Sequence, residues 1–333
     1  MTLVDLVAAL MFVGVVAYGI FGGADFGTGV WDLLAGDARH GGALRAQVDR
    51  SIGPVWEANH VWLIYVLVFL WTGFPRAIGP IMTTLWVPFL FAGLGIVLRG
   101  AGFAFRKFSS TLEQARLFGV LFASSSVVTP MFFGMIAGAI ASGEVPVEGG
   151  DLWRSWTGLT SWVGGVLAVL ACAFLAATFL AADAERAGDH ELARYCGRRA
   201  LVSGAVTGVV ALAAVPILRD DAPTLADNLD GRAAPLVILS ALAGAAALVL
   251  LWNRSWAWAR VGAVVAVGCV LTGWGVAQYP DVLVDHLTLE EAAGARATLN
   301  GLVIAFCIAA VTAVPALIWL FTLVNRSNRS LQH

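Results

Sequence analysis

Long apolar stretches separated by short polar connections make up most of this chain of 333 residues. An α-helix needs about 20 mostly apolar residues to cross the hydrocarbon core of a bilayer. The stretches that fit this length lie at residues 4–24, 55–73, 77–98, 117–141, 157–182, 199–218, 233–252, 256–278 and 297–323. The pattern therefore predicts an all-α membrane protein with about nine transmembrane helices, in a single polytopic domain over residues 1–333. The segment between the first two stretches, and residues 183–198, are each long enough for an interfacial helix.

The distribution of basic residues predicts how these helices are oriented. Cytoplasmic connections of membrane proteins accumulate Lys and Arg. Of the 20 basic residues, most fall on one side of the predicted helices, namely Arg39, Arg45, Arg50, Arg99, Arg106, Lys107, Arg116, Arg186, Arg194, Arg198, Arg199, Arg254, Arg260, Arg326 and Arg329. The opposite side holds Arg76, Arg154, Arg219, Arg232 and Arg296. We therefore expect the N-terminus outside and the C-terminus in the cytoplasm.

Composition supports this picture and excludes several classes of protein. Hydrophobic residues make up 59% of the chain and charged residues 13%, and the mean hydropathy is +0.82. A soluble domain is about half apolar and a quarter charged, so we expect a multi-pass protein of a bacterial inner membrane. The net charge of −2 and the absence of long basic runs exclude a nucleic-acid partner. The four cysteines are widely spaced, which supports neither a disulfide framework nor a Cys-x-x-Cys metal site.

Acidic residues near the predicted membrane boundary are the candidates for chemistry, because ionisable groups in hydrocarbon are costly. Asp25 is predicted near the cytoplasmic end of the first helix and Glu57 in the first turn of the second. His60 follows Glu57 by three residues, so the two share a helix face, with the histidine about 4.5 Å deeper. These three residues are candidates for a proton pathway from the cytoplasm.

Structural alternatives remain open for all three candidates. Glu57 can simply favour the positive N-terminal end of its helix, and His60 can be a hydrogen-bonded packing residue. Asp25 can form an ion pair with Arg99, which is predicted to reach the same leaflet. The glycines around Asp25 would allow a neighbouring backbone to approach closely under either interpretation.

Metal and haem binding by this chain are both disfavoured. Glu57-x-x-His60 matches one half of a carboxylate-bridged di-iron motif, but no second Glu-x-x-His occurs. A haem needs an axial His or Met at membrane depth, and the candidates are few: His60, Met82, Met131 and Met135. We therefore expect no metal and no cofactor bound by this chain alone.

Four motifs in the first third of the sequence resemble those of the cytochrome bd oxidase subunit II family. The first runs from Gly23 to Gly29 and has the form Gly-x-Asp-Phe-Gly-x-Gly, with Gly27 as its fifth residue. The second begins at Pro54 and continues through Trp56, Glu57, Asn59, Val61 and Trp62. The remaining two are Phe74-Pro75 and the segment from Leu98 to Arg106, which contains Arg99.

The resemblance implies a quinol oxidase complex that reduces dioxygen to water. In this family a partner, subunit I, carries haem b, haem d and the quinol site. Subunit II is implied to be a scaffold of two four-helix bundles and a peripheral helix that contributes to proton supply. Small accessory membrane subunits, membrane lipid and a structural quinone are further partners that the resemblance accommodates. Gly23, Gly27, Gly29, Trp56, Asn59, Trp62, Arg99 and Arg106 are then the residues of the helix-packing motifs.

This sequence departs from the family pattern at three positions. Glu57 replaces an Asp, Ala58 replaces a Gly, and Ala104 stands where the family has an Asp. If that Asp belongs to the proton path of the family, the path in this chain must differ or rely on Glu57, His60 and water. Two other functions stay open: a secondary transporter, which would share the buried charges and Gly-rich helices, and a subunit II homologue that serves assembly alone.

Overall fold

The computed structural model describes residues 1–36, 38–52 and 56–330. Its elements, in chain order, are α1 (Leu3–Ala17), the π-helical turn η1 (Tyr18–Gly22), α2 (Gly23–Leu33), α3 (Ala38–Ile52), α4 (Trp56–Gly73), α5 (Pro75–Phe108), α6 (Leu112–Ala141), α7 (Arg154–Thr157), α8 (Leu159–Arg186), α9 (His190–Asp221), α10 (Pro223–Asp230), α11 (Ala234–Trp252), α12 (Trp256–Gln278), β1 (Asp281–Leu283), β2 (Leu287–Thr288), α13 (Leu289–Ala292) and α14 (Arg296–Ser330). The prediction of a helical membrane protein is confirmed.

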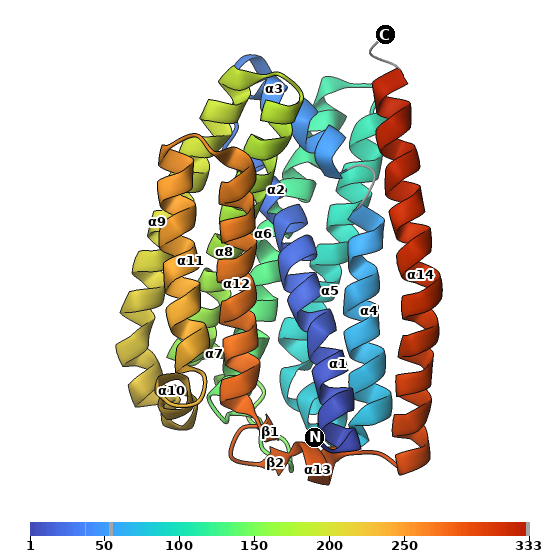
Figure 1. The fold of residues 1–333 in the computed structure, drawn as a ribbon, viewed down its shortest axis with the longest axis vertical. Helices are drawn as coiled ribbons and strands as arrows, with labels where there is room; N and C mark the ends of the chain where they lie inside the picture. Colours follow the sequence, from blue (N-terminus) through green and yellow to red (C-terminus); the bar gives the residue numbers. More distant parts are fainter. Residues whose placement is uncertain (37, 53–55, 331–333) are drawn as a thin grey trace.

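Seven helical spans among the described residues are long and apolar enough to cross a membrane. They are 3–33, 75–106, 112–141, 159–186, 190–221, 234–252 and 256–278. Helices α4 and α14 run alongside them in Figure 1. The count of nine and the orientation of the chain stay predictions.

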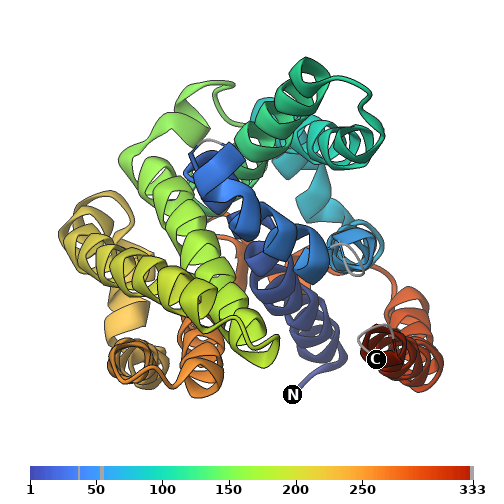
Figure 2. The same ribbon diagram turned by 90° about the horizontal axis from the view of Figure 1, so that it is seen from above.

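The helices pack as two adjoining groups of four. In one group α8 packs on α9 and α12, and α11 packs on α9 and α12. The other group consists of α4, α5, α6 and the continuous segment from α1 to α2. In it α6 lies between α2 and α5, while α4 contacts α1 and α5. Contacts of α8 with α2 and α6 join the two groups, and α14 packs outside on α1 and α4. Figure 2 shows α8 between the groups and α14 at the edge of the molecule.

Two short antiparallel strands close one end of the helical body. Asp281 pairs with Thr288 and Leu283 with Leu287. The chain begins at this end, where α10 and α13 also lie, whereas α3 and the end of α14 lie at the opposite end (Figure 1). The functional candidates lie toward the α3 end, where α2, α3 and the last turns of α5 meet.

Several helices extend beyond the predicted apolar stretches. The first was predicted to end at residue 24, but helical structure continues through η1 and α2 to Leu33. Helix α5 continues ten residues past the predicted end at residue 98. A helix predicted from hydropathy ends where charged residues begin, but the charges in these extensions are paired with one another, as described below. Residues 183–198 hold no separate interfacial helix, because α8 and α9 are joined by residues 187–189, whereas α3 occupies the segment before α4.

Candidate functional site

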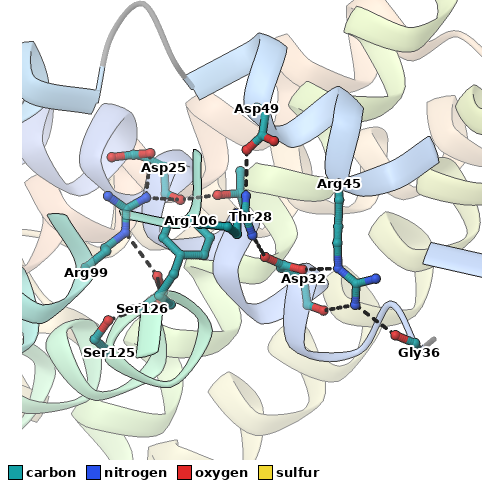
Figure 3. Close-up of polar contacts among 11 residues, drawn as sticks. Asp25, Thr28, Asp32, Gly36, Arg45, Asp49, Arg99, Arg106, Ser125 and Ser126 are labelled. Carbon is teal, nitrogen blue, oxygen red and sulfur yellow. Dashed lines mark hydrogen bonds and ion pairs between the residues drawn. The ribbon is translucent and has the colours of Figure 1, made fainter. Parts of the chain in front are cut away.

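The sequence predicted Asp25 near the end of the first helix. In the structure Asp25 lies inside a continuous helical segment instead. It is the third residue of α2, eight residues before Leu33. Its Oδ1 accepts a hydrogen bond from Nη2 of Arg99 at 2.8 Å, and its backbone carbonyl accepts one from the same nitrogen at 3.2 Å. The two side chains are 2% and 1% exposed. Asp25 and Arg99 therefore form a buried ion pair between α2 and α5 (Figure 3).

The charge of Arg99 is compensated on every side. Its Nε donates to the hydroxyl of Ser126 on α6 at 3.0 Å. The guanidinium also lies 5.1 Å from the ring centroid of Phe26 and 4.9 Å from that of Phe122. An aromatic face attracts a cation most strongly where water is excluded. Arg99 thus holds α2, α5 and α6 together.

Asp25 is less completely satisfied than its partner. Its second carboxylate oxygen, Oδ2, is buried and has no hydrogen-bond partner among the described residues. The polar side chain that α4 places next to this carboxyl is Asn59, which is itself buried. A buried carboxylate oxygen without a donor is costly. Oδ2 is therefore the least satisfied acceptor of this cluster among the described residues.

A second ionic group continues from the first along α2. Asp32 is buried and accepts from Nε of Arg45 at 2.6 Å and from Nη1 of Arg106 at 2.5 Å. Nη2 of Arg106 also donates to Asp49 on α3 at 2.6 Å. Figure 3 shows this group connecting α2, α3 and α5 at the α3 end of the molecule. Arg106 therefore bridges two carboxylates.

Asp32, Arg45 and Asp49 were not among the predicted site residues. A signal for Asp32 was nevertheless available in the spacing. Asp25 and Asp32 are seven residues apart, as are Arg99 and Arg106, and both ion pairs join residues 74 positions apart. Seven residues make about two helical turns, or roughly 10 Å, so each helix presents its two charges on one face. Arg45 and Asp49 reach their partners, Asp32 and Arg106, because of where α3 docks. No local sequence pattern predicts that docking.

Glu57 is exposed near the start of α4, and it has no hydrogen bond or ion pair to any described residue. His60, one turn further, is half-buried, and its Nδ1 lies 3.4 Å from the hydroxyl of Tyr18 in η1. The His60 ring also lies 6.0 Å from that of Phe26. The structure thus brings His60 and Asn59 to the Asp25 cluster, while Glu57 faces outward.

The glycines of α2 lie where neighbouring helices approach most closely. A Cβ at Gly27 would lie 1.8 Å from the carbonyl oxygen of Cys172 on α8. A Cβ at Gly29 would lie 2.2 Å from Cβ of Ser126 on α6, whereas at Gly23 the nearest atoms would be at an ordinary 3.4 Å. Close backbone contact through small residues is typical of helices packed in lipid. Gly27 and Gly29 therefore set the distances from α2 to α8 and α6.

The second motif contains two tryptophans, Trp56 and Trp62. The Trp62 ring is half-buried and meets that of Tyr65 edge-on, with centroids 6.2 Å apart. The side chain of Trp56, like residue Pro54, lies outside the described part of the structure.

Among the residues that were described, no group of three His, Cys, Asp or Glu side chains is placed to hold a metal ion.

Comparison with known proteins gives a consistent result. The family model described as cytochrome bd terminal oxidase subunit II matches residues 3–324. A cytochrome bd ubiquinol oxidase subunit 2 of Bacillus subtilis is 26% identical over 172 residues, a match that spans about half of each chain. A putative cytochrome bd menaquinol oxidase subunit II of the same organism is 21% identical, over 95% of this chain and 93% of that protein.

The fold is also similar to that of a solved structure. A chain of the bd oxidase from Geobacillus thermodenitrificans superimposes with a TM-score of 0.82 at 24% identity, covering 97% of this chain and 99% of that one. The family match over nearly the whole length, the helical fold and the seven apolar spans agree with one another. This chain is a multi-pass membrane protein that belongs to the cytochrome bd terminal oxidase subunit II family.

Proposed function

We propose that this chain is the haem-free second subunit of a quinol oxidase complex, which couples quinol oxidation to the reduction of dioxygen to water. The observation that carries this proposal is the family match over residues 3–324. The same match weighs against a secondary transporter. In the proposed complex the chain crosses the membrane nine times, with its N-terminus outside, and supports subunit I, which carries haem b and haem d.

The experiment that tests this partnership is purification of the chain from its native membrane. We expect it to co-purify with a haem-bearing membrane subunit and to show no Soret absorbance when separated from it. The redox difference spectrum of the complex should show haem b and haem d. Stoichiometric haem on the separated chain would overturn the proposal, as would purification without any haem-bearing partner.

A role in cytoplasmic proton supply is the second part of the proposal, and Glu57 is its best candidate. Glu57 is exposed, and one turn away His60 approaches the hydroxyl of Tyr18 at 3.4 Å. In the proposed path Glu57 would take up protons at the surface and pass them by way of water, His60 and Tyr18 toward the Asp25 cluster. Asp25 itself is paired with Arg99, which favours its structural alternative, although Oδ2 remains available to a proton.

Substitution of Glu57 separates proton supply from assembly. Glu57→Gln keeps the size and hydrogen-bonding capacity of the side chain but removes the titratable group, whereas Glu57→Asp keeps the acid. We expect Gln to assemble with normal haem content and to lose most quinol-oxidase turnover, while Asp retains much of it. Glu113→Gln is the matched control, because Glu113 is an exposed carboxylate in the first turn of α6. Full turnover in a normally assembled Glu57→Gln complex would remove Glu57 from the path and favour the assembly role.

A further inference from the structure

A cavity of about 380 Å³ lies where α9 begins and α11 turns into α12. Figure 1 places the α11–α12 turn at the same end of the molecule as α3, away from α5 and α14. The residues that line it are Arg194, Gly197, Arg198, Leu201, Leu251, Trp252, Arg254 and Trp256. None of them takes part in the ionic cluster around Asp25.

Positive charge is concentrated in this cavity, and no acidic residue is among those that line it. Arg194 and Arg198 are four residues apart on α9 and so share a face, where like charges repel. Arg254 adds a third guanidinium from the α11–α12 turn. All three side chains are exposed, and none forms a hydrogen bond or ion pair with a residue in the described ranges. Such an arrangement favours an anion that offers several oxygen acceptors.

The walls of the cavity are aromatic and apolar. Trp256 is 7% exposed and packs on α9 at Gly197, where a Cβ would lie 2.2 Å from the indole ring. Trp252 is 76% exposed at the end of α11. Tryptophan at a helix end is typical of the headgroup level of a bilayer. The absence of a side chain at Gly197 therefore makes room for the Trp256 indole, and both tryptophans line the cavity at that level.

Arg254 follows the last turn of α11 and ends that helix. Its φ is +59°, in the left-handed region that favours glycine or asparagine. An arginine at this position keeps a strained backbone that glycine would relieve. The N–H of Arg254 donates to the carbonyl of Leu251 and that of Ser255 to the carbonyl of Leu250, the Schellman arrangement with which helices commonly end.

We propose that this cavity binds the headgroup of an anionic phospholipid. The three arginines would hold the phosphate oxygens, and the acyl chains would lie along the apolar surface that continues from the cavity. That surface includes Val202 on α9 and Val249 on α11, which are 63% and 60% exposed. Basic pockets between transmembrane helices are suited to such headgroups. A soluble phosphate would use the arginines but none of the apolar surface.

The test compares phospholipids retained by the purified complex after detergent exchange, measured by mass spectrometry. Arg254→Gly removes one guanidinium and relieves the backbone, so a loss of lipid cannot be ascribed to a strained turn. We expect this variant to retain about fivefold less anionic phospholipid relative to zwitterionic phospholipid, because one basic contact is lost. Arg254→Lys should retain lipid as the native chain does. Arg116→Gln, at an exposed arginine of α6 outside the cavity, is the charge-matched control and should have no effect.

A second measurement distinguishes the source of the phosphate. Delipidated complex is returned to nanodiscs of phosphatidylglycerol or phosphatidylcholine, or is given inorganic phosphate in detergent. Phosphatidylglycerol alone should raise the melting temperature, and Arg254→Gly should reduce the rise. Equal lipid retention by Arg254→Gly and the native chain would overturn the proposal. Equal stabilisation by inorganic phosphate would also overturn the proposal. So would an Arg254→Gly complex that loses a protein partner while its lipid content stays unchanged. Since both readouts are independent of haem and turnover, their failure would leave the oxidase role untouched.

Discussion

Arg99 is the largest of the fully buried side chains in the described part of the chain. A carboxylate, a hydroxyl and two aromatic rings surround its guanidinium there. A buried ion pair adds little net stability when both charges must be desolvated, but removing one partner leaves the other uncompensated. Removing one partner of the Asp25–Arg99 pair should therefore cost more stability than the intact pair adds.

Arg99→Gln should lower the free energy of unfolding by about 3–5 kcal/mol, because the Asp25 carboxylate would remain buried without a cation. Adding Asp25→Asn to this variant should recover part of the loss, since no buried charge is then left. The measurement is the folded fraction of the purified complex across a titration with denaturing detergent.

The exposed pair Arg219–Asp230 provides the control for this prediction. Its side chains are 61% and 62% exposed, so Arg219→Gln should cost less than about 1 kcal/mol. If the double variant proved no more stable than Arg99→Gln, burial of an unpaired charge would not be the cause of the damage.

Close helix contact, at the scale of the elements, depends on particular glycines of α2. The carbonyl oxygen at Cys172 belongs to the backbone of α8, so it cannot rotate away from a methyl group at Gly27. Helix α8 also packs on α6, α9 and α12. A displacement of α8 would therefore be transmitted to both groups of helices.

Gly27→Ala is accordingly predicted to reduce stability by about 1–3 kcal/mol or more, the usual cost of overpacking. Gly93→Ala is the matched control within α5, because a Cβ there would meet nothing within 4 Å. The control should be neutral or slightly stabilising, since alanine favours helix more than glycine does. Thermal melting of the complex would measure both, and equal melting temperatures for the two variants would contradict the packing argument.

The helices illustrate what a sequence can and cannot predict. Apolar length predicted the helical class because a span must fill the hydrocarbon core, and α11 and α12 begin and end within a residue of expectation. Hydropathy ended the first and third helices too early, because it scores the charges of Asp25, Asp32, Arg99 and Arg106 as if each were alone. Arg45 and Asp49 join the site only through the docking of α3, which has no local pattern.

Across the whole molecule, the first residue and the end of α14 lie at opposite ends of the helical body (Figure 1). An odd number of crossings would produce this arrangement. With the basic residues concentrated on one side, we predict that the C-terminus is cytoplasmic. A reporter active only in the periplasm should therefore be silent when fused after His333 and active when fused before Met1. Activity at the C-terminal fusion would show that one crossing has been miscounted.

The separation of 74 positions between the members of each ion pair also has a meaning for biosynthesis. At about 5–20 residues per second, the ribosome would add Arg99 roughly 4–15 s after Asp25. During that interval the newly made α2 has its two carboxylates and neither arginine of α5. Arg45 follows Asp32 by only 13 positions and can pair with it early, whereas the carboxyl of Asp25 would have to stay in contact with water until Arg99 arrives. The nascent chain should accordingly resist extraction from the membrane by alkaline carbonate only after α5 has emerged, and stalled chains of increasing length would show whether it does.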